Sequence, residues 1–208
     1  MKSKLSVFDR VALALIAAAT AVTAGLYPRL PAQIPVHFDL YGRADGFLPK
    51  AVGAPLLIVI AAFVWAFVRY GARLLPASAR ERYEQSPMEV AGLLSAAFMV
   101  GLQFCVLSAA LSDGAFGRGF AVLLGAFWVL MGLLFPRLRR NPFVGIRVRW
   151  TMQSDENWAR THRFAGQCFV LAGVVALLSA AAGSVALAIV AVLFSALVPV
   201  VYSWRMAK

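Results

Sequence analysis

Residues 166–202 read GQCFVLAGVVALLSAAAGSVALAIVAVLFSALVPVVY, a stretch without a single charged residue. Only Gly183 and Ser184 interrupt it, and they divide it into two apolar runs, 166–182 and 184–202. A helix needs roughly 20 apolar residues to cross a hydrocarbon core of about 30 Å, and a run of about 17 is at the short end of that range. We therefore predict two membrane-spanning helices joined by a tight hairpin.

Four further apolar runs precede this pair, at residues 11–27, 51–68, 90–111 and 119–135. Hydrophobic residues make up 62% of the 208 residues and charged residues 14%, against roughly 45–50% and about 25% in a soluble domain. This composition excludes a water-soluble globule and a disordered chain. Two cysteines, Cys105 and Cys168, are too few for a disulfide scaffold. The prediction is an all-α polytopic membrane protein, with six transmembrane helices in one membrane domain over residues 1–208.

Lysine and arginine are distributed unevenly between the two sides of these spans. Most of the 20 such residues lie at the two termini and in the second and fourth loops, and this set includes Lys2, Lys4 and Lys208. The opposite side has only Arg29, Arg43, Lys50 and Arg118. Because cytoplasmic loops carry the positive excess, we expect both termini in the cytoplasm and residues 28–50 outside. The basic start followed by Val22-Thr23-Ala24 also resembles a cleavable signal peptide, whose removal would leave five spans.

The net charge of +11 does not indicate nucleic-acid binding, because the basic residues flank apolar spans rather than cover one soluble face. Anionic lipid is the expected partner. Each juxtamembrane Lys or Arg contributes about 1 kcal/mol of attraction to an anionic leaflet. The candidate lipid-binding residues are Arg137, Arg139 and Arg140 in the fourth loop.

The segment 28–50 has the pattern of a structured external loop. Its centre alternates between an apolar side, with Ile34, Val36, Phe38 and Leu40, and a polar side, with His37, Asp39 and Tyr41. Asp45-Gly46 predicts a turn, and Pro49 fits the first turn of the second helix. We expect an extended segment whose apolar edge packs on the membrane domain.

His37, Asp39 and Asp45 are the potential metal ligands of this loop, since imidazole and carboxylate groups suit Zn²⁺ and an open fourth position would make the site catalytic. The alternative is that the carboxylates accept hydrogen bonds from turn amides and that His37 makes a polar contact. The other histidine, His162, is expected on the cytoplasmic side. No Ser, His and acidic residue can be placed together as a hydrolase triad, and no His-Glu-x-x-His motif is present. We expect no metal, no cofactor and no catalytic residue.

The six apolar runs contain no Asp, Glu, Lys, Arg or His, the residues that mark ion and proton paths in membranes. Gln103 is the main polar exception. This pattern argues against an ion-coupled transporter, although a pore lined by backbone carbonyls would escape the test.

The segment 136–165 is the predicted cytoplasmic counterpart of the external loop. Thr151 or Ser154 can cap a helix whose first turn carries Asp155 and Glu156, and these acids suit the positive end of the helix dipole. One face of that helix would contain Trp158, Thr161, His162 and Ala165. We predict an amphipathic cytoplasmic helix that continues into the fifth span. The physical pattern favours an interfacial helix that seats this span over a binding surface.

The two loops together resemble a known family. The cytoplasmic motif consists of Gly145-Ile146-Arg147, Trp150-Thr151, Ser154-Asp155-Glu156, Trp158 and Thr161-His162-Arg163-Phe164-Ala165-Gly166. It resembles the signature of the SdpI immunity family, with Val148 in place of an expected Thr. The external motif consists of Ile34-Pro35-Val36-His37-Phe38, Gly42, Asp45-Gly46 and Pro49-Lys50. It is similar to a domain of unknown function that often forms the N-terminal part of such proteins.

This resemblance implies a six-helix protein of the bacterial cytoplasmic (inner) membrane that is not an enzyme and protects its cell from a secreted peptide toxin. In the best-known member, the toxin-engaged protein is thought to hold a small transcriptional repressor at the membrane. A toxin and a repressor are therefore the expected partners, and the oligomeric state is open. The alternatives are a transporter of small molecules or peptides and a metal-dependent membrane enzyme.

The resemblance also indicates candidate residues in both loops. The candidates in the toxin-facing loop are Pro35, His37, Asp39, Gly42, Asp45, Gly46 and Lys50. The candidates in the cytoplasmic signature are Gly145, Ile146, Arg147, Trp150, Thr151, Trp158, Thr161, His162 and Gly166.

Overall fold

The computed structural model describes residues 5–84, 87–112 and 116–207. Within these residues, six helices are long and apolar enough to cross a membrane, which confirms the predicted all-α class. The same residues contain one small sheet, a two-stranded hairpin. Lys2, Lys4 and Lys208, three of the predicted cytoplasmic charges, lie outside the described residues.

The long helices account for most of the chain. They are α1 (Val7–Leu26), α3 (Leu56–Tyr70), α5 (Met88–Leu111), α6 (Phe116–Leu134), α8 (Asp155–Ala181) and α9 (Val185–Arg205). The shorter helices are α2 (Lys50–Gly53), α4 (Ala77–Glu84) and α7 (Arg149–Gln153), with 3₁₀ turns at Tyr27–Arg29, Gly71–Leu74 and Phe135–Arg137. The strands are β1 (Gln33–Phe38) and β2 (Ala44–Pro49). Asp9 and Arg69 fall inside α1 and α3, because α1 begins before its apolar run and α3 ends after its own.

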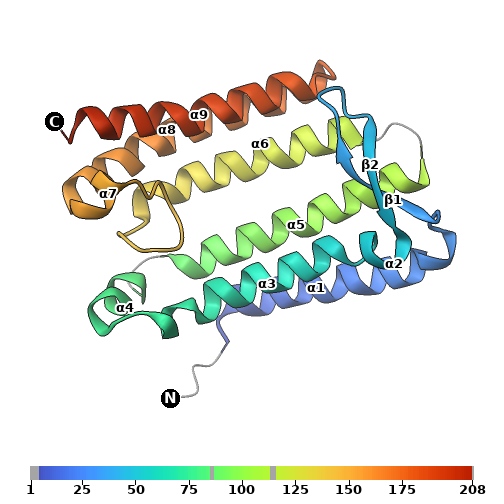
Figure 1. Ribbon diagram of the computed structural model, residues 1–208, viewed down its shortest axis with the longest axis horizontal. Coiled ribbons are helices and arrows are strands. Elements are labelled where there is room, and N and C mark those ends of the chain that lie inside the picture. Colours follow the sequence, from blue (N-terminus) through green and yellow to red (C-terminus); the bar gives the residue numbers. More distant parts are fainter. Residues whose placement is uncertain (1–4, 85–86, 113–115, 208) are drawn as a thin grey trace.

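The six long helices lie side by side in two groups of three (Figure 1). In one group α1, α3 and α5 contact one another, in the other α6, α8 and α9 do, and α5 packs on α6 to join them. The start of α1, the end of α9, α4 and α7 lie at one end, which we call the basic end (Figure 1). The strands cover the opposite end, the hairpin end. The segments 28–50 and 136–165 therefore lie at opposite ends of the bundle. The assignment of the basic end to the cytoplasm remains a prediction from charge.

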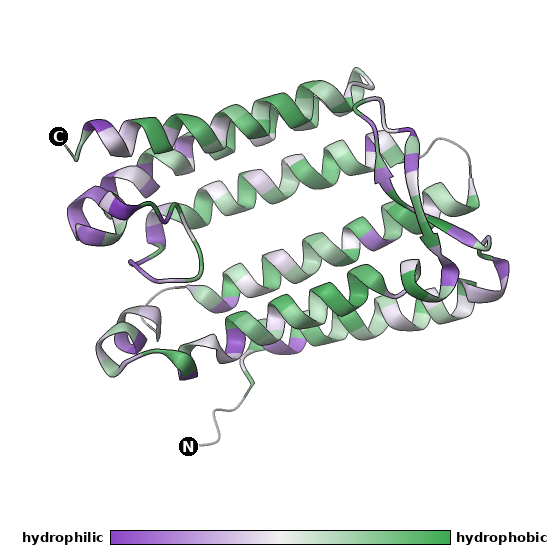
Figure 2. Cartoon of the chain, viewed as in Figure 1, coloured by the Kyte–Doolittle hydropathy of each residue, from purple (hydrophilic) through white to green (hydrophobic). Residues whose placement is uncertain are grey.

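The outer surface of the bundle is apolar along the helices and polar at the two ends (Figure 2). Large side chains such as Phe63, Leu178 and Phe194 are about two-thirds exposed on the helix surfaces, at 67%, 67% and 64%. In water such exposure would be unfavourable, whereas lipid tails are as apolar as these side chains. The distribution supports a multi-pass membrane protein.

Serine side chains begin three of the long helices. Ser6 and Asp9 form a reciprocal capping box on α1, and Ser184 caps α9 after the turn at Gly183, whose φ is +69°. Ser154 accepts a hydrogen bond from the Asn157 N–H and caps α8, as the sequence predicts. The predicted helix does continue into the fifth span, because its residues form the first turns of α8. The separate helix at this point is the short α7, which the sequence did not indicate.

The hairpin differs from its prediction in two details. The turn lies at Asp39 to Gly42, where the Gly42 N–H donates to the Asp39 carbonyl, and not at Asp45-Gly46. Asp45 and Gly46 lie inside β2, beside an irregularity in the register with β1. Leu40 also departs from the predicted alternation: it is 56% exposed, because the strand has already ended at Phe38.

Glycines allow α6 and α8 to approach closely. A Cβ at Gly166 would lie 2.6 Å from the carbonyl oxygen of Gly132, and a Cβ at Gly173 would lie 2.7 Å from that of Gly125. Real Cβ atoms do not approach backbone so closely, so larger residues would force the helices apart. Gly166, one of the signature candidates, therefore determines how the fifth span packs.

Gly166→Ala should lower the free energy of unfolding by about 1–3 kcal/mol, the usual cost of an overpacked contact. Gly25→Ala is the matched control, because a Cβ at Gly25 would have no atom within 4 Å. The control should be neutral or up to about 1 kcal/mol more stable through helix propensity. Thermal unfolding in detergent micelles measures both, and equal melting temperatures for the two variants would contradict the packing argument.

Candidate functional site

Apolar side chains hold the hairpin on the helix bundle. Ile34 is fully buried, and a Cβ on Gly53 of α2 would lie 2.8 Å from its Cβ. The ring of Phe38 stacks on Phe116 of α6, with centroids 3.5 Å apart and planes at 3°. Phe116 stacks in turn on Phe120. The predicted docking of the apolar edge on the membrane domain is confirmed for these residues.

The hairpin turn depends on Asp39 and Gly42. The Asp39 carboxylate accepts hydrogen bonds from the backbone N–H groups of Tyr41 and Arg43, at 2.8 and 2.9 Å. The N–H of Arg43 is the main reason why the pKa of Asp39 is lower than its usual value. Gly42 has a φ of +79° and a Cβ there would lie 3.2 Å from Gly117 of α6. Both candidates therefore shape the turn.

Three other candidates of this loop also face inward. Pro35 is buried in β1. Gly46 lies against His37, where a Cβ would come within 2.8 Å of the His37 Cβ. The Lys50 ammonium donates to the carbonyls of Tyr27 and Leu30, at 3.1 and 2.9 Å, and so satisfies the end of the first span. Gly46 and Lys50 therefore support the hairpin, whereas the buried Pro35 also lines a recess beside it.

The outward face of the hairpin carries exposed polar and aromatic groups. His37 Nδ1 lies 2.5 Å from Asp45 Oδ1, and both side chains are exposed. Tyr41 is 77% exposed and Phe47 54% exposed, although both are large and apolar. The sequence reasoning missed these two rings as site residues. The available signal was Tyr41, which the alternation already placed on the polar side of the loop, whereas Phe47 lies outside the alternating segment.

A recess of about 500 Å³ adjoins this outward face, between the hairpin and the ends of α5 and α6. Its hairpin wall includes Pro35, Arg43 and Phe47, and its helix wall includes Ala109 and Ala110. The wall is mainly apolar, and the small alanines leave it open. The recess can therefore receive an apolar side chain next to a cationic group.

The potential metal ligands do not converge. In the described ranges, no group of three His, Cys, Asp or Glu side chains is placed to hold a metal ion. Asp39 is occupied by the turn amides, while His37 and Asp45 contact each other. The geometry therefore gives the metal-dependent alternative no support.

At the basic end, residues 138–154 form a loop against α8, which we call the signature loop. The His162 ring stacks on Trp158 with centroids 3.9 Å apart, and its Nδ1 donates to the Trp158 carbonyl at 2.8 Å. Its Nε2 accepts the backbone N–H of Ile146 at 3.0 Å. Gly145 has a φ of +126°, and a Cβ there would collide with His162 Nε2. The predicted face of α8 is thus buried under the loop.

Further hydrogen bonds close the signature loop. The Thr151 hydroxyl donates to the Ile146 carbonyl at 2.7 Å and accepts the Val148 N–H at 3.1 Å. The indole N–H of Trp158 donates to the Leu138 carbonyl at 2.7 Å. Each of these groups is satisfied within the protein, which favours a structural role for Thr151 and Trp158.

Two signature candidates connect this region to the last helix. Trp150 donates to the Ser203 hydroxyl of α9 at 2.7 Å. Thr161 donates to the Asn157 side chain at 3.0 Å, and Asn157 donates to the Ser203 carbonyl at the same distance. Ser203 is therefore a partner that the sequence motif did not reveal.

The arginines of the fourth loop differ in their surroundings. Arg140 lies 2.6 Å from the Asp155 carboxylate, and Arg147 is exposed while its guanidinium donates to the Pro142 carbonyl. Arg137 is exposed and donates to the Leu133 carbonyl at 2.6 Å. Arg139 is exposed as well. Arg140 is thus already paired with an acid, whereas the exposed Arg137 binds only a backbone carbonyl in the described part of the chain.

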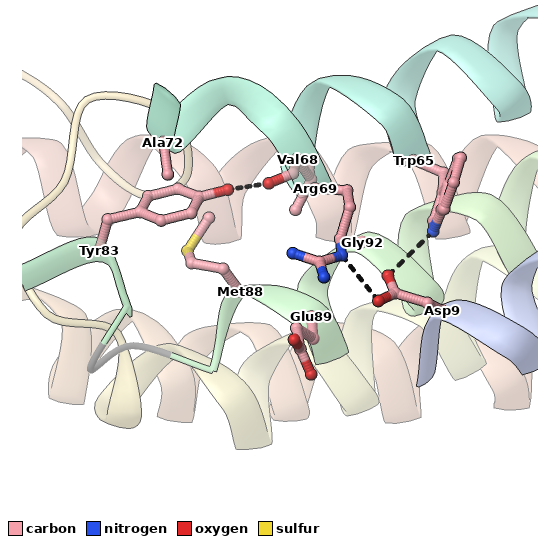
Figure 3. Close-up of a pocket in the computed structure, with 9 residues that line it drawn as sticks. All are labelled: Asp9, Trp65, Val68, Arg69, Ala72, Tyr83, Met88, Glu89 and Gly92. Atoms are coloured by element: carbon pink, nitrogen blue, oxygen red, sulfur yellow. Dashed lines mark hydrogen bonds and ion pairs between the residues drawn. The ribbon is translucent and has the colours of Figure 1, made fainter. Parts of the chain in front are cut away.

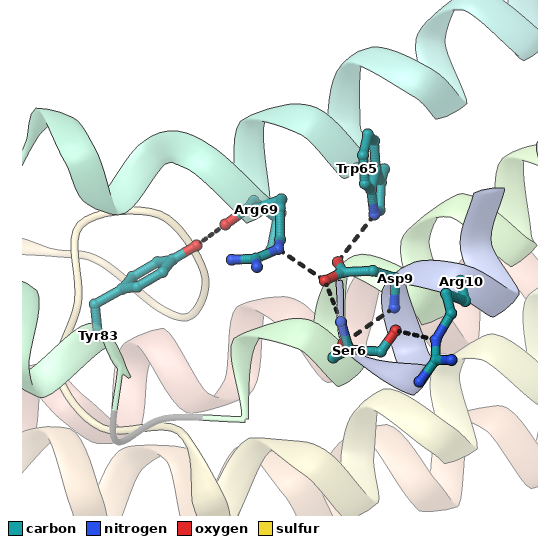
Figure 4. Close-up of polar contacts among 7 residues, drawn as sticks. Ser6, Asp9, Arg10, Trp65, Arg69 and Tyr83 are labelled. Atoms are coloured by element: carbon teal, nitrogen blue, oxygen red, sulfur yellow. Dashed lines mark hydrogen bonds and ion pairs between the residues drawn. The ribbon is translucent and has the colours of Figure 1, made fainter. Parts of the chain in front are cut away.

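A buried ion pair near the basic end connects α1 to α3, and the sequence reasoning missed it. Arg69 Nε lies 2.7 Å from Asp9 Oδ2, and the Trp65 indole donates to Asp9 Oδ1 at 3.2 Å. Ser6 and Arg10 complete the cluster at the start of α1 (Figure 4). Charges inside membrane helices are costly unless paired. This pair compensates both charges, and its residues lie just beyond the apolar runs that define the spans.

The ion pair borders a cavity of about 290 Å³ between α1, α3, α4 and α5. The guanidinium of Arg69 points into the space between Asp9 and Tyr83 (Figure 3). Burial raises the pKa of Tyr83 to about 12, so its hydroxyl stays protonated and donates to the Val68 carbonyl. Tyr83 thereby fastens α4, an element that the sequence did not indicate, to α3.

His162→Phe should destabilise the signature loop while keeping the aromatic stack. The change removes the acceptor of the Ile146 N–H, and an unsatisfied buried donor costs about 1–3 kcal/mol. We expect a lower melting temperature in detergent and faster trypsin cleavage at Arg147. Arg160→Ala, an exposed change on the same helix, should alter neither quantity. Wild-type cleavage kinetics for His162→Phe would refute this role.

Two family models match this chain, and each match includes one of the two loops described above. Residues 137–203 match the SdpI/YfhL protein family, and residues 14–62 match DUF1648, a domain of unknown function. The first match covers the signature loop, α8 and α9, and the second covers most of α1, the hairpin and the first half of α3. No curated protein and no solved structure matches the chain. The family descriptions name no enzymatic activity. The chain therefore contains an SdpI/YfhL-type region at residues 137–203 and a DUF1648 region at residues 14–62.

Proposed function

We propose that this chain is an immunity protein of the bacterial cytoplasmic membrane, and that the outward face of its hairpin intercepts a secreted, membrane-active peptide toxin. The family match supports an immunity-type role. Two exposed rings carry the toxin-binding part: Phe47 lines the recess at the hairpin end, and Tyr41 lies under the guanidinium of Arg43, which lines the same recess.

The rings of Tyr41 and Phe47 lie on a hairpin that is packed firmly on the helix bundle, which suits recognition of a partner. The hairpin is fixed to the bundle by Ile34 and by the Phe38–Phe116 stack, so little ordering is needed when a partner binds. A peptide that acts on membranes must present an apolar face, and aromatic side chains over an apolar recess are the usual anchors for such a face. The His37–Asp45 pair and Arg43 add polar groups at the rim.

The second part of the proposal is that the basic end takes part in signalling. The signature loop is held in one conformation by its bonds to α8 and α9, and it leaves the side chains of Arg147 and Arg149 exposed. A small transcriptional repressor with an acidic surface would complement these arginines. We propose this surface as the place where a repressor is held at the membrane.

A transport function has less support from the helices. Gln103 is fully buried and its amide donates to the Ala54 carbonyl and the Thr23 hydroxyl, at 2.7 and 3.2 Å. Asp9 and Arg69 compensate each other near one end. These polar groups join helices to one another, which is a structural task.

The test is a survival assay in a toxin-sensitive bacterium. Cells that express the protein are challenged with the peptide toxin secreted by a producer strain, while survival and membrane potential are followed. We expect the wild type to protect. Tyr41→Ala with Phe47→Ala should abolish protection, because each lost ring contact weakens binding by roughly ten-fold or more.

The matched control is Phe63→Ala with Phe194→Ala, which removes two exposed rings from the lipid-facing helices instead. It should protect as well as the wild type at equal membrane levels by immunoblot. If the hairpin variant protected equally well, the toxin-binding face would be wrong. If the wild type itself gave no protection, the immunity function would be wrong for this chain.

A further inference from the structure

An open apolar groove of about 740 Å³ runs between α6 and α8 near the basic end. Leu133, Val170, Leu171 and Val174 line its length, and Gly132 and Gly166 lie where the two helices cross. Because these glycines have no side chains, the groove is deeper than an ordinary furrow between helices. Its shape and apolar walls suit a hydrocarbon chain.

The end of this groove is cationic. Arg137 and Arg163 both line it, and both side chains are exposed. No acidic residue is among the groove residues in the described part of the chain. The nearby acids are directed to other arginines, since Asp155 pairs with Arg140 and Glu156 with Arg160.

The two groove arginines therefore keep donors available. Arg137 uses one nitrogen to bind the Leu133 carbonyl at 2.6 Å. Arg163 makes no hydrogen bond or ion pair within residues 5–84, 87–112 and 116–207. Guanidinium groups bind phosphate oxygens through charge-assisted, often bidentate, hydrogen bonds. Gln167, also at the groove, adds a neutral donor.

We propose that this groove is a specific site for one anionic phospholipid. The headgroup phosphate lies between Arg137 and Arg163, and one acyl chain follows the groove along Val170 and Val174. This assignment differs from general attraction to the membrane, because it requires the arginines and the groove together. It also shifts the lipid-binding residues from the Arg137, Arg139 and Arg140 set to Arg137 and Arg163.

The experiment uses the full chain, purified in detergent and stripped of lipid, and counts bound lipid by native mass spectrometry. The protein should bind one molecule of phosphatidylglycerol, and with higher affinity than it binds phosphatidylcholine. Arg137→Gln with Arg163→Gln should weaken phosphatidylglycerol binding by roughly 30-fold, from about 1 kcal/mol per arginine. Arg149→Gln with Arg205→Gln, an equal charge loss on α7 and α9, should leave the affinity unchanged.

Two further arms test the groove itself. Val174→Trp fills it without touching the arginines and should abolish specific binding of phosphatidylglycerol. Glycerol phosphate, which carries the headgroup charge without acyl chains, should fail to compete. Equal affinity for both lipids, wild-type affinity in the Arg137→Gln with Arg163→Gln variant, or effective competition by glycerol phosphate would each overturn the proposal. If Val174→Trp does not fold, the arginine variant and the competition decide the outcome.

Discussion

The absence of hydrogen-bond partners in a hydrocarbon core is the constraint on which the structure depends. Six helices satisfy their own backbone groups, so the polar chemistry of the chain collects at the two ends of the bundle. The polar side chains inside the long helices also find partners there. Gln103 donates to a carbonyl at the break between α2 and α3, and Asp9 pairs with Arg69. The hairpin and the signature loop are therefore the two places where a partner finds specific polar groups.

Most residues that identify the family are buried supports. Trp158, Thr161 and His162 are hidden under the signature loop, and Gly145 and Gly166 permit close approaches. The same holds at the hairpin for Pro35, Gly42 and Gly46. A family match of this kind consequently shows a scaffold. The proposed recognition surfaces depend on exposed residues outside the motifs, such as Tyr41, and on Arg147 within them.

Sequence reasoning predicted the elements whose signals are local. Hydropathy gave six spans, and Ser154 followed by Asp155 and Glu156 correctly marked the start of α8. It placed the hairpin turn wrongly, because Asp45-Gly46 and the Asp39 to Gly42 segment both carry turn chemistry. The strand before the turn ends at Phe38, whose ring stacks on Phe116, and local turn chemistry does not report a contact between residues so far apart in the chain. The Asp9–Arg69 pair was missed for the same reason, since no local pattern links α1 to α3.

The orientation of the bundle is the most direct test, because both parts of the proposed function require the hairpin outside and the signature loop inside. With Cys105 and Cys168 replaced by Ala, single cysteines at Tyr41 and Arg147 are treated with a membrane-impermeant maleimide. We expect Tyr41→Cys to be labelled in intact cells and Arg147→Cys to be labelled only after the inner membrane is opened. Labelling of Arg147→Cys in intact cells, with Tyr41→Cys protected, would contradict this orientation.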